Sequence, residues 1–521
     1  MENCNKGKIL DTNTSNNKRI AKNTLMLYAR MFLTMPITLY SSRVVLNALG
    51  VDDFGLYSVV GGFVAMFAII SNSLTASISR FITYELGVGG NKDQLRKVFS
   101  TTVIIQLLIS CIVIFLSETL GVWFLNVCMN IPSERLFATN WVFQFSLLSF
   151  ITNLMSIPYN ASIVAHEKMG AFAYISIVQA IGTLFVAFLI DYAPFDRLIF
   201  YAMLMLVLSV SIRCLYLWYC KKHFSECHFI WLWDVFLIKR IFSFAGWNFI
   251  GASSGILRDH GVNILLNVFC GPVVNAARGV AMQVSGAVTS FANNFMMALN
   301  PQITKSYAVG NLECTMDLVL QGARYSFYLL LLLSLPVLME THTILKLWLK
   351  IVPDYTVSFV RLILLYAIFE SISNTMITLM LATGKIRNYQ LLVGGLQLMN
   401  FPISYLLLKI GYAPETTVLV AIGIAFCCMF LRAYMLRIMI GFDIRRFLHV
   451  VVLNVLLVSC LSLIIPYCTT FLFEEGIIRL VISVPICMIS TTCVIFFIGC
   501  SEQERSFALK KIFQLKQKFF L

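Results

Sequence analysis

Long apolar runs, each of roughly twenty residues, recur from one end of the chain to the other and constrain its fold more than any other feature. A run of this length crosses the hydrocarbon core of a bilayer as an α-helix, because every backbone group must then find a partner within the segment. Hydrophobic residues make up 59% of the 521 residues and charged residues only 12%, more apolar surface than one water-soluble core needs. The sequence therefore predicts an all-α, polytopic membrane protein.

Short polar breaks separate the apolar runs and predict about fourteen transmembrane helices, as two series of six and a final pair. The first series is expected near residues 25–47, 54–79, 99–118, 138–165, 170–190 and 198–219. The second series and the final pair are expected near residues 241–267, 274–300, 323–340, 358–382, 388–408, 415–436, 447–468 and 477–499.

These spans divide the chain into six parts, of which the first is expected to be disordered. The parts are a cytoplasmic N-terminal tail (1–24), an N-terminal six-helix lobe (25–219), a cytoplasmic linker (220–240), a C-terminal six-helix lobe (241–436), two extra helices (447–499) and a basic cytoplasmic tail (500–521).

The net charge of +14 comes from Lys and Arg residues in the short segments between apolar runs. A nucleic-acid-binding protein would gather such residues on one basic domain, so no nucleic-acid partner is expected. When the N-terminus is placed in the cytoplasm, the inside segments hold most of these cations. The distribution therefore predicts that both termini are cytoplasmic.

Motifs of soluble enzymes are not found in the sequence. It has no G-x-x-x-x-G-K loop that would hold the phosphates of ATP, and no loop between the predicted spans is long enough for a catalytic domain. The fifteen cysteines show no spacing typical of disulfides or metal sites. We therefore expect a protein that is not an enzyme and binds no metal or other cofactor.

Short sequence matches indicate an internal repeat. Leu46-Asn47 recurs as Leu266-Asn267, and Gly90-Asn91 recurs as Gly310-Asn311, both with an offset of 220. A weaker match, with an offset of 217, relates the four residues at 165–168 to those at 382–385. The equivalent places of these matches in two six-span series predict two lobes in parallel repeat, related by an axis along the membrane normal.

Polar residues inside the apolar runs are the best candidates for a site, because each costs energy unless it faces a partner or a water-filled cavity. Arg258, Asp259 and His260 lie together within the predicted seventh span. In a functional interpretation, Arg258 binds a phosphate group through two hydrogen bonds, and Asp259 or His260 couples transport to protons. Alternatively, Arg258 and Asp259 belong to a buried ion pair that fixes helix packing.

Other candidates lie on polar stripes of three further spans. Arg30 and Thr34 share one helix face in the first span, where Arg30 either faces a cavity or extends to the cytoplasm. In the eighth span Arg278 shares a stripe with Ser285, Thr289, Asn293 and Asn300, and either contacts a ligand or anchors the helix at the interface. Asn263 lies on the same face as His260. Glu370 in the tenth span is either a proton or sodium site or a counter-charge for an arginine.

Two stretches of sequence carry a resemblance to a known family. The stretch Tyr40–Tyr57, "YSSRVVLNALGVDDFGLY", and residues 158–177, "PYNASIVAHEKMGAFAYISI", resemble polysaccharide transporters of the Wzx O-antigen flippase type. Their superfamily also includes lipid II flippases and multidrug and toxin extrusion antiporters. The resemblance implies two six-helix lobes around a central cavity that opens alternately to the two sides.

The resemblance also implies a substrate and a location. The substrate would be an undecaprenyl-diphosphate-linked oligosaccharide, such as an O-antigen repeat unit, that passes from the inner to the outer leaflet of the bacterial plasma membrane. Its partners would be this lipid-linked saccharide, membrane lipids and a polysaccharide polymerase or other assembly proteins. A lipid II flippase, a drug-cation antiporter and a non-transporting scaffold remain as alternatives, although a cation antiporter would need cavity carboxylates without competing arginines.

Overall fold

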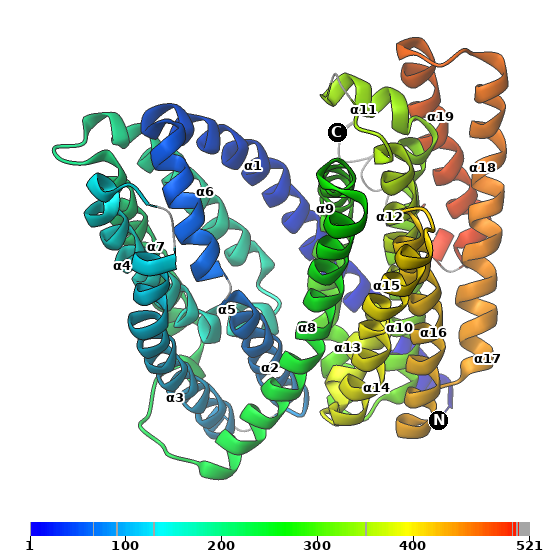
Figure 1. Ribbon diagram of the computed structural model, residues 1–521. Coiled ribbons are helices and arrows are strands. Elements are labelled where there is room, and N and C mark those ends of the chain that lie inside the picture. The colour runs from blue at the N-terminus through cyan, green and yellow to red at the C-terminus, as the bar shows by residue number, and fades with distance from the viewer. Residues whose placement is uncertain are drawn as a thin grey trace, which may run out of the picture. The chain divides into compact units, whose positions relative to one another are not determined.

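The computed structural model describes residues 2–65, 67–89, 92–128, 131–349, 352–502, 504–506 and 509, and every regular element in these ranges is a helix (Figure 1). Ten of the described helical segments are long and apolar enough to cross a membrane, or eleven when the bent pair α12 (Thr356–Ser371) and α13 (Asn374–Thr383) counts as one span. The predicted all-α membrane fold is therefore confirmed, whereas the number fourteen stays a prediction.

The difference between the fourteen predicted spans and these eleven concerns the predicted first, second and eighth spans. These segments are helical, but they lie in α1 (Glu2–Ala65), α2 (Ala68–Gly87) and α9 (Pro272–Ala308), which are not among the ten. Polar residues along α9, from Arg278 to Asn293, lower its hydropathy. The same polar residues line the cavity described below.

The chain packs as two compact units. Unit 1 contains Met1–Ala252 and Met297–Asn311, and unit 2 contains Ser253–Met296 and Leu312–Leu521. The division falls inside α8 (Val235–Cys270) and inside α9, each of which passes from one unit to the other. The predicted superposition of two six-helix lobes stays a prediction.

Unit 1 contains the N-terminal helices. They are α1, α2, α3 (Lys92–Leu116), α4 (Leu136–Leu154), α5 (Ile157–Ala165), α6 (Met169–Leu189) and α7 (Arg197–His223), with short turns η1 (Ser117–Gly121), η2 (Phe124–Cys128), η3 (Ser133–Arg135), η4 (Ile190–Tyr192) and η5 (Ser225–Cys227). Helix α1 begins at Glu2, so the expectation that residues 1–24 are disordered is wrong for the described residues 2–24. Because helix propagation adds one hydrogen bond per residue, the apolar first span can extend into this polar segment.

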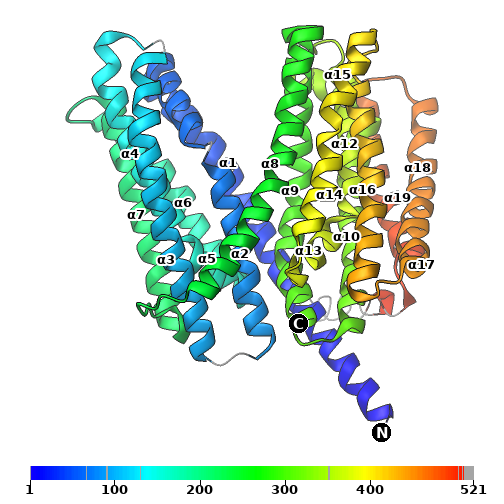
Figure 2. The ribbon, with the colours of Figure 1, turned by 60° about the horizontal axis from the view of Figure 1, so that its bottom comes forward.

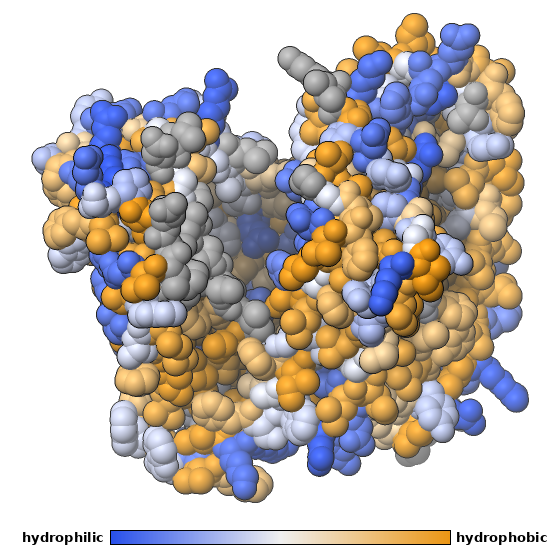
Figure 3. Space-filling model, in the orientation of Figure 1, coloured by the Kyte–Doolittle hydropathy of each residue, from blue (hydrophilic) through white to orange (hydrophobic). Residues whose placement is uncertain are grey.

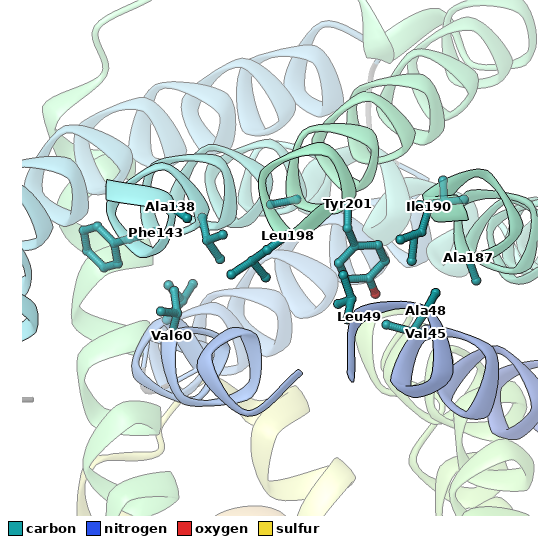
Figure 4. Close-up of a cluster of buried hydrophobic side chains, with 14 of the residues drawn as sticks. Val45, Ala48, Leu49, Val60, Ala138, Phe143, Ala187, Ile190, Leu198 and Tyr201 are labelled. Carbon is teal, nitrogen blue, oxygen red and sulfur yellow. The ribbon is translucent and has the colours of Figure 1, made fainter. Parts of the chain in front are cut away.

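A kink in α1 at Gly50 shapes the core of unit 1. Gly50 has φ 80°, a left-handed conformation that favours glycine, and it lets the two parts of α1 run in different directions. Val45 and Leu49 before the kink, and Val60 after it, pack with Tyr201 in one buried cluster (Figure 4). Close van der Waals packing of this kind stabilises helix association in lipid, where the hydrophobic effect between helices is absent.

Unit 2 contains the remaining helices (Figure 2). Besides the parts of α8 and α9 within Ser253–Met296 they are α10 (Leu312–Met339), α11 (Thr341–Leu349), α12, α13, α14 (Arg387–Leu398), α15 (Asn400–Ile410), α16 (Thr416–Ile440), α17 (Ile444–Phe447), η6 (Leu448–Leu453), α18 (Asn454–Leu472), α19 (Ile477–Val494) and η7 (Ile495–Gly499). Hydrophobic side chains cover much of the visible helix surface (Figure 3), as expected for helices in contact with lipid.

Helix α19 and the segment η7 after it are held by buried polar contacts against α10 and the residue that follows α10. Glu340, whose side chain is fully buried, pairs with Arg479 of α19 at 2.9 Å and accepts a hydrogen bond from Ser483 at 3.0 Å. At the other end, Arg324 donates to the carbonyl of Gly499 at 3.0 Å. The predicted extra helices are therefore an integral part of unit 2.

Two local features of the backbone recur 217 residues apart, which is the offset of the weaker sequence match. Met155 and Ser156 separate α4 from α5. Ile372 and Ser373, 217 residues later, separate α12 from α13 in the same way. The residues that follow α5 and α13 include Glu167 (φ 58°) and Gly384 (φ 76°), again 217 apart and both left-handed. The pair Gly90-Asn91, used for the other match, lies outside the described residues.

Candidate functional site

A polar cavity of about 340 Å³ lies within unit 2, among α8, α9, α12 and α16. Four charged side chains line it, namely those of Arg258, Asp259, Arg278 and Glu370. The rest of the polar wall consists of hydroxyl and amide side chains, which are Ser285, Thr289, Ser371, Asn374, Asn293, Gln397, Asn400 and Thr417. Such a lining of neutral donors and acceptors around a few charges suits a ligand that has both charged and polar groups.

The polar stripe of α9 forms one wall of this cavity. Arg278, Ser285, Thr289 and Asn293 are spaced seven, four and four residues apart, which places them on one side of a helix, and all four line the cavity. Arg278 is only 6% exposed. Its place in the cavity wall favours the alternative in which Arg278 contacts a ligand, and both alternatives stay predictions.

Arg258 is held by two neighbours. Its Nε donates to Oδ1 of Asp259 at 3.0 Å and its Nη2 donates to Oδ2 at 3.1 Å, while its Nη1 donates to the hydroxyl of Tyr366 at 2.8 Å. Helical geometry points consecutive side chains about 100° apart, but the long arginine side chain turns back to reach the carboxylate of the next residue. An ion pair of Arg258 with Asp259 is therefore present, with the Asp259 side chain 41% exposed, and its role in helix packing stays a prediction.

Glu370 is the second cavity carboxylate and it also pairs with an arginine. Its Oε1 lies 3.1 Å from Nη2 of Arg432, a residue of α16 whose side chain is 1% exposed. The sequence interpretation did not include Arg432 as a candidate, although it lies within the predicted twelfth span, about one helical turn before the end of that span. Tyr366 was missed as well, and its position one helical turn before Glu370 could have indicated it.

Arg278 differs from the other two arginines because both of its hydrogen-bond acceptors are neutral. Its Nη1 donates to the main-chain carbonyl of Asp259 at 3.1 Å and to Oδ1 of Asn263. Its buried Nε has no hydrogen-bond partner among the described residues. Arg432 pairs with Glu370 but is not among the described residues that line the cavity. When Arg432 is counted with the four charged lining residues, three arginines accompany two carboxylates, which leaves one positive charge in excess. Among these described arginines, Arg278 is the one without a carboxylate partner.

The remaining predicted site residues lie elsewhere. Arg30 and Thr34 belong to α1 in unit 1, where the guanidinium of half-buried Arg30 lies over the ring of Phe172, 4.9 Å from its centroid. His260 is exposed and is not among the residues that line the cavity. The structure therefore brings together Arg258, Asp259, Arg278, Asn293 and Glu370, with Asn263 joined to them through Arg278.

Comparison with known proteins places the chain in a family. Residues 20–307, more than half of the chain, match the family model described as polysaccharide biosynthesis protein. The chain belongs to this family. No curated protein sequence matches it. The family confirms the resemblance to polysaccharide transporters that the two sequence stretches carry.

Solved structures of MATE and related transporters share the fold. A MATE structure in the bent conformation aligns with a TM-score of 0.70 at 13% identity, covering 81% of this chain and 96% of that one. The MATE transporter ClbM in complex with Rb+ aligns with a TM-score of 0.67 at 16% identity, covering 82% and 96%. A MOP superfamily transporter from Pyrococcus furiosus, described as having a binding pocket of reversed polarity that suggests a different function, aligns with a TM-score of 0.68 at 12% identity, covering 81% and 95%.

Family and fold together support a multi-pass membrane exporter. They point to a transporter rather than to a catalytic enzyme. In such a protein a polar cavity enclosed by membrane helices is the natural place for a ligand, because buried charges within the membrane are tolerated where they face a cavity or a partner.

Proposed function

We propose that the protein exports an undecaprenyl-diphosphate-linked oligosaccharide, such as a surface polysaccharide repeat unit, across the bacterial inner membrane by alternating access. The observation that supports this proposal is the excess positive charge of Arg278 in the cavity of unit 2. A guanidinium offers planar pairs of N–H donors that match phosphate oxygens. The hydroxyl and amide side chains around it offer hydrogen bonds to sugar hydroxyls.

A cation antiporter is the competing candidate, because the solved structures with this fold include MATE transporters. A cationic drug needs a carboxylate that is free to pair with it. Both cavity carboxylates already pair with arginines, Asp259 with Arg258 and Glu370 with Arg432. The excess charge is positive and favours an anion. A lipid II flippase would carry the same diphosphate and differ only in the saccharide.

The proposal includes the topology and the partners. Both termini are in the cytoplasm, and the head group enters the cavity from the cytoplasmic leaflet. A polysaccharide polymerase or another assembly protein then receives the saccharide on the opposite side. Membrane lipids surround the helices, and nucleic acid has no role.

The test is export by cells in which the protein carries Arg278→Ala. We expect surface polysaccharide to fall by about tenfold or more, the loss that removal of one charge-assisted interaction produces, while the protein accumulates normally. Arg446→Ala is the matched control, because Arg446 forms a half-exposed pair with Asp317 at 2.7 Å outside the cavity.

Normal export by an abundant Arg278→Ala protein would contradict the proposal. Two other results would indicate a different substrate. Arrest of cell-wall synthesis, with surface polysaccharide intact, would indicate lipid II as the substrate. Loss of resistance to cationic drugs in the Glu370→Gln protein, with polysaccharide export unchanged, would indicate a cation antiporter.

A further inference from the structure

We propose that Asp259 is an internal competitor for the substrate anion: its carboxylate occupies the guanidinium of Arg258 and yields it to the second phosphate of an incoming diphosphate. This inference rests on the proposed function and deepens it, because it assigns separate arginines to the two phosphates. It also predicts that the cavity distinguishes a diphosphate from a monophosphate.

The contacts of Arg258 show that Asp259 occupies the edge of the guanidinium that a phosphate would use. Asp259 uses Nε and Nη2, the pair of donors on one edge of the guanidinium, at 3.0 Å and 3.1 Å. A phosphate that binds arginine through two parallel hydrogen bonds uses such an edge. Asp259 therefore holds the arginine in the same way that a substrate phosphate would, and the two anions cannot occupy that edge together.

Exposure indicates which of the two residues can move. The side chain of Asp259 is 41% exposed, whereas that of Arg258 is 16% exposed. The carboxylate of Asp259 lines the cavity and can turn within it. The guanidinium is retained by a third contact, because Nη1 donates to the hydroxyl of Tyr366 at 2.8 Å and uses neither of the atoms that bind Asp259. Tyr366 is thus a positioning residue that keeps Arg258 in place during the exchange.

The position of Arg278 provides a second arginine next to Asp259, for the other phosphate. Arg278 donates to the main-chain carbonyl of Asp259 at 3.1 Å, while Arg258 binds the side chain of the same residue. The two arginines therefore contact the same residue, Arg278 at its main chain and Arg258 at its side chain. A monophosphate meets the excess charge at Arg278 alone, whereas a diphosphate has a second anionic group that can replace the carboxylate of Asp259 at Arg258.

Calorimetric titration of the purified full-length protein with inorganic pyrophosphate and with orthophosphate tests the proposal. The variant Asp259→Asn keeps the shape of the side chain and removes its charge. We expect it to bind pyrophosphate about tenfold more tightly than the wild-type protein, as release of one charge-assisted interaction allows. Orthophosphate should gain much less. Asp317→Asn, which removes a carboxylate outside the cavity, should change neither affinity.

A double variant separates the guanidinium of Arg258 from net charge. Arg258→Gln combined with Asp259→Asn removes one charge of each sign and so keeps the wild-type excess of one positive charge. If Asp259 competes for Arg258, the gain of Asp259→Asn disappears in the double variant. A gain that persists without Arg258, or an Asp259→Asn protein that binds pyrophosphate no more tightly than the wild type, would overturn the inference.

Failure of this inference is distinguishable from failure of the proposed function. Unchanged pyrophosphate affinity in Asp259→Asn, together with lost export in Arg278→Ala, would leave the exporter intact and remove only the role of Asp259. Normal export by Arg278→Ala would instead remove the proposed function, whatever Asp259→Asn does.

Discussion

Glu167 in unit 1 and Arg278 in unit 2 are both buried charged side chains, but they are satisfied differently. In unit 1, Glu167 is 2% exposed at its side chain and lies 2.6 Å from Nε of Arg19 and 2.7 Å from Nζ of Lys305, with Gln302 as a further donor. In unit 2, the buried cation Arg278 has only neutral acceptors. Removal of one member of a buried ion pair destabilises the fold because it leaves the other charge uncompensated, whereas a buried charge that has no opposite charge beside it is suited to a ligand.

Removal of Glu167 should have the largest effect on stability. Glu167→Ala leaves Arg19 and Lys305 without their shared carboxylate, and loss of one member of a buried pair costs about 3 kcal/mol or more. We expect a clearly lower Tm for the purified protein, and an intact cavity in the molecules that remain folded. An unchanged Tm would show that this cluster does not stabilise unit 1, and would remove the contrast between the units.

Arg432→Ala should destabilise unit 2 by about 2–3 kcal/mol, because it leaves Glu370 beside the cavity without its counter-charge. It should also weaken anion binding, since the excess positive charge disappears. Glu370→Gln added to Arg432→Ala should restore much of the Tm. If the double variant is no more stable than Arg432→Ala, the two residues are not coupled as a pair.

Tyr366→Phe should leave the Tm nearly unchanged and weaken binding of pyrophosphate. The hydroxyl accepts one hydrogen bond from Arg258, and a contact of this kind contributes about 1 kcal/mol, or roughly fivefold in affinity. Calorimetry of the wild type and the variant measures the difference. An affinity equal to that of the wild type would show that Tyr366 does not position Arg258.

The smallest expected effect is the pH dependence of stability that the contact between Glu226 and His166 gives unit 1. Glu226 is buried and pairs with His166, which stacks on Phe224 at 4.2 Å. Burial raises the pKa of the Glu226 carboxyl, but the hydrogen bond from His166 and the charges of His166 and Lys92 outweigh it and hold the pKa below its ordinary value. The stabilisation is therefore complete above about pH 4.3 and is lost as the pH falls below it.

The measurement is the Tm of the wild-type and Glu226→Gln proteins between about pH 5 and pH 3, the range around the ordinary carboxyl pKa. The wild-type protein should lose more of its Tm over this range. Parallel curves for the two proteins would show that the His166–Glu226 contact adds no pH-dependent stability.

The sequence predicts those parts of the fold that depend on local pattern. Long apolar runs predict the helices, and helical spacing predicts that Arg278, Ser285, Thr289 and Asn293 share a wall, because both follow from the period of one helix. The polar tail is different. Nothing in the composition of residues 2–24 indicates whether a helix that nucleates in the apolar run will extend into them.

The pairing of charges could not be predicted in the same way. The contact between Arg258 and Asp259 depends on the side-chain torsions of adjacent residues, which helical period does not determine. The pair of Glu370 and Arg432 joins residues 62 positions apart, and depends on how α12 packs on α16. Arg432 could have been included as a candidate because it lies within a predicted span, but its partner could be identified only from the structure.

Binding of an undecaprenyl-diphosphate-linked saccharide to the purified protein tests the central claim most directly. The wild-type protein is compared with Arg278→Gln and with Glu167→Gln, which alters the carboxylate that Arg19 and Lys305 share in unit 1. We predict that Arg278→Gln lowers the affinity by about tenfold or more with little change in Tm, and that Glu167→Gln lowers the Tm with little change in affinity. Equal affinities for the wild-type and Arg278→Gln proteins would contradict the account.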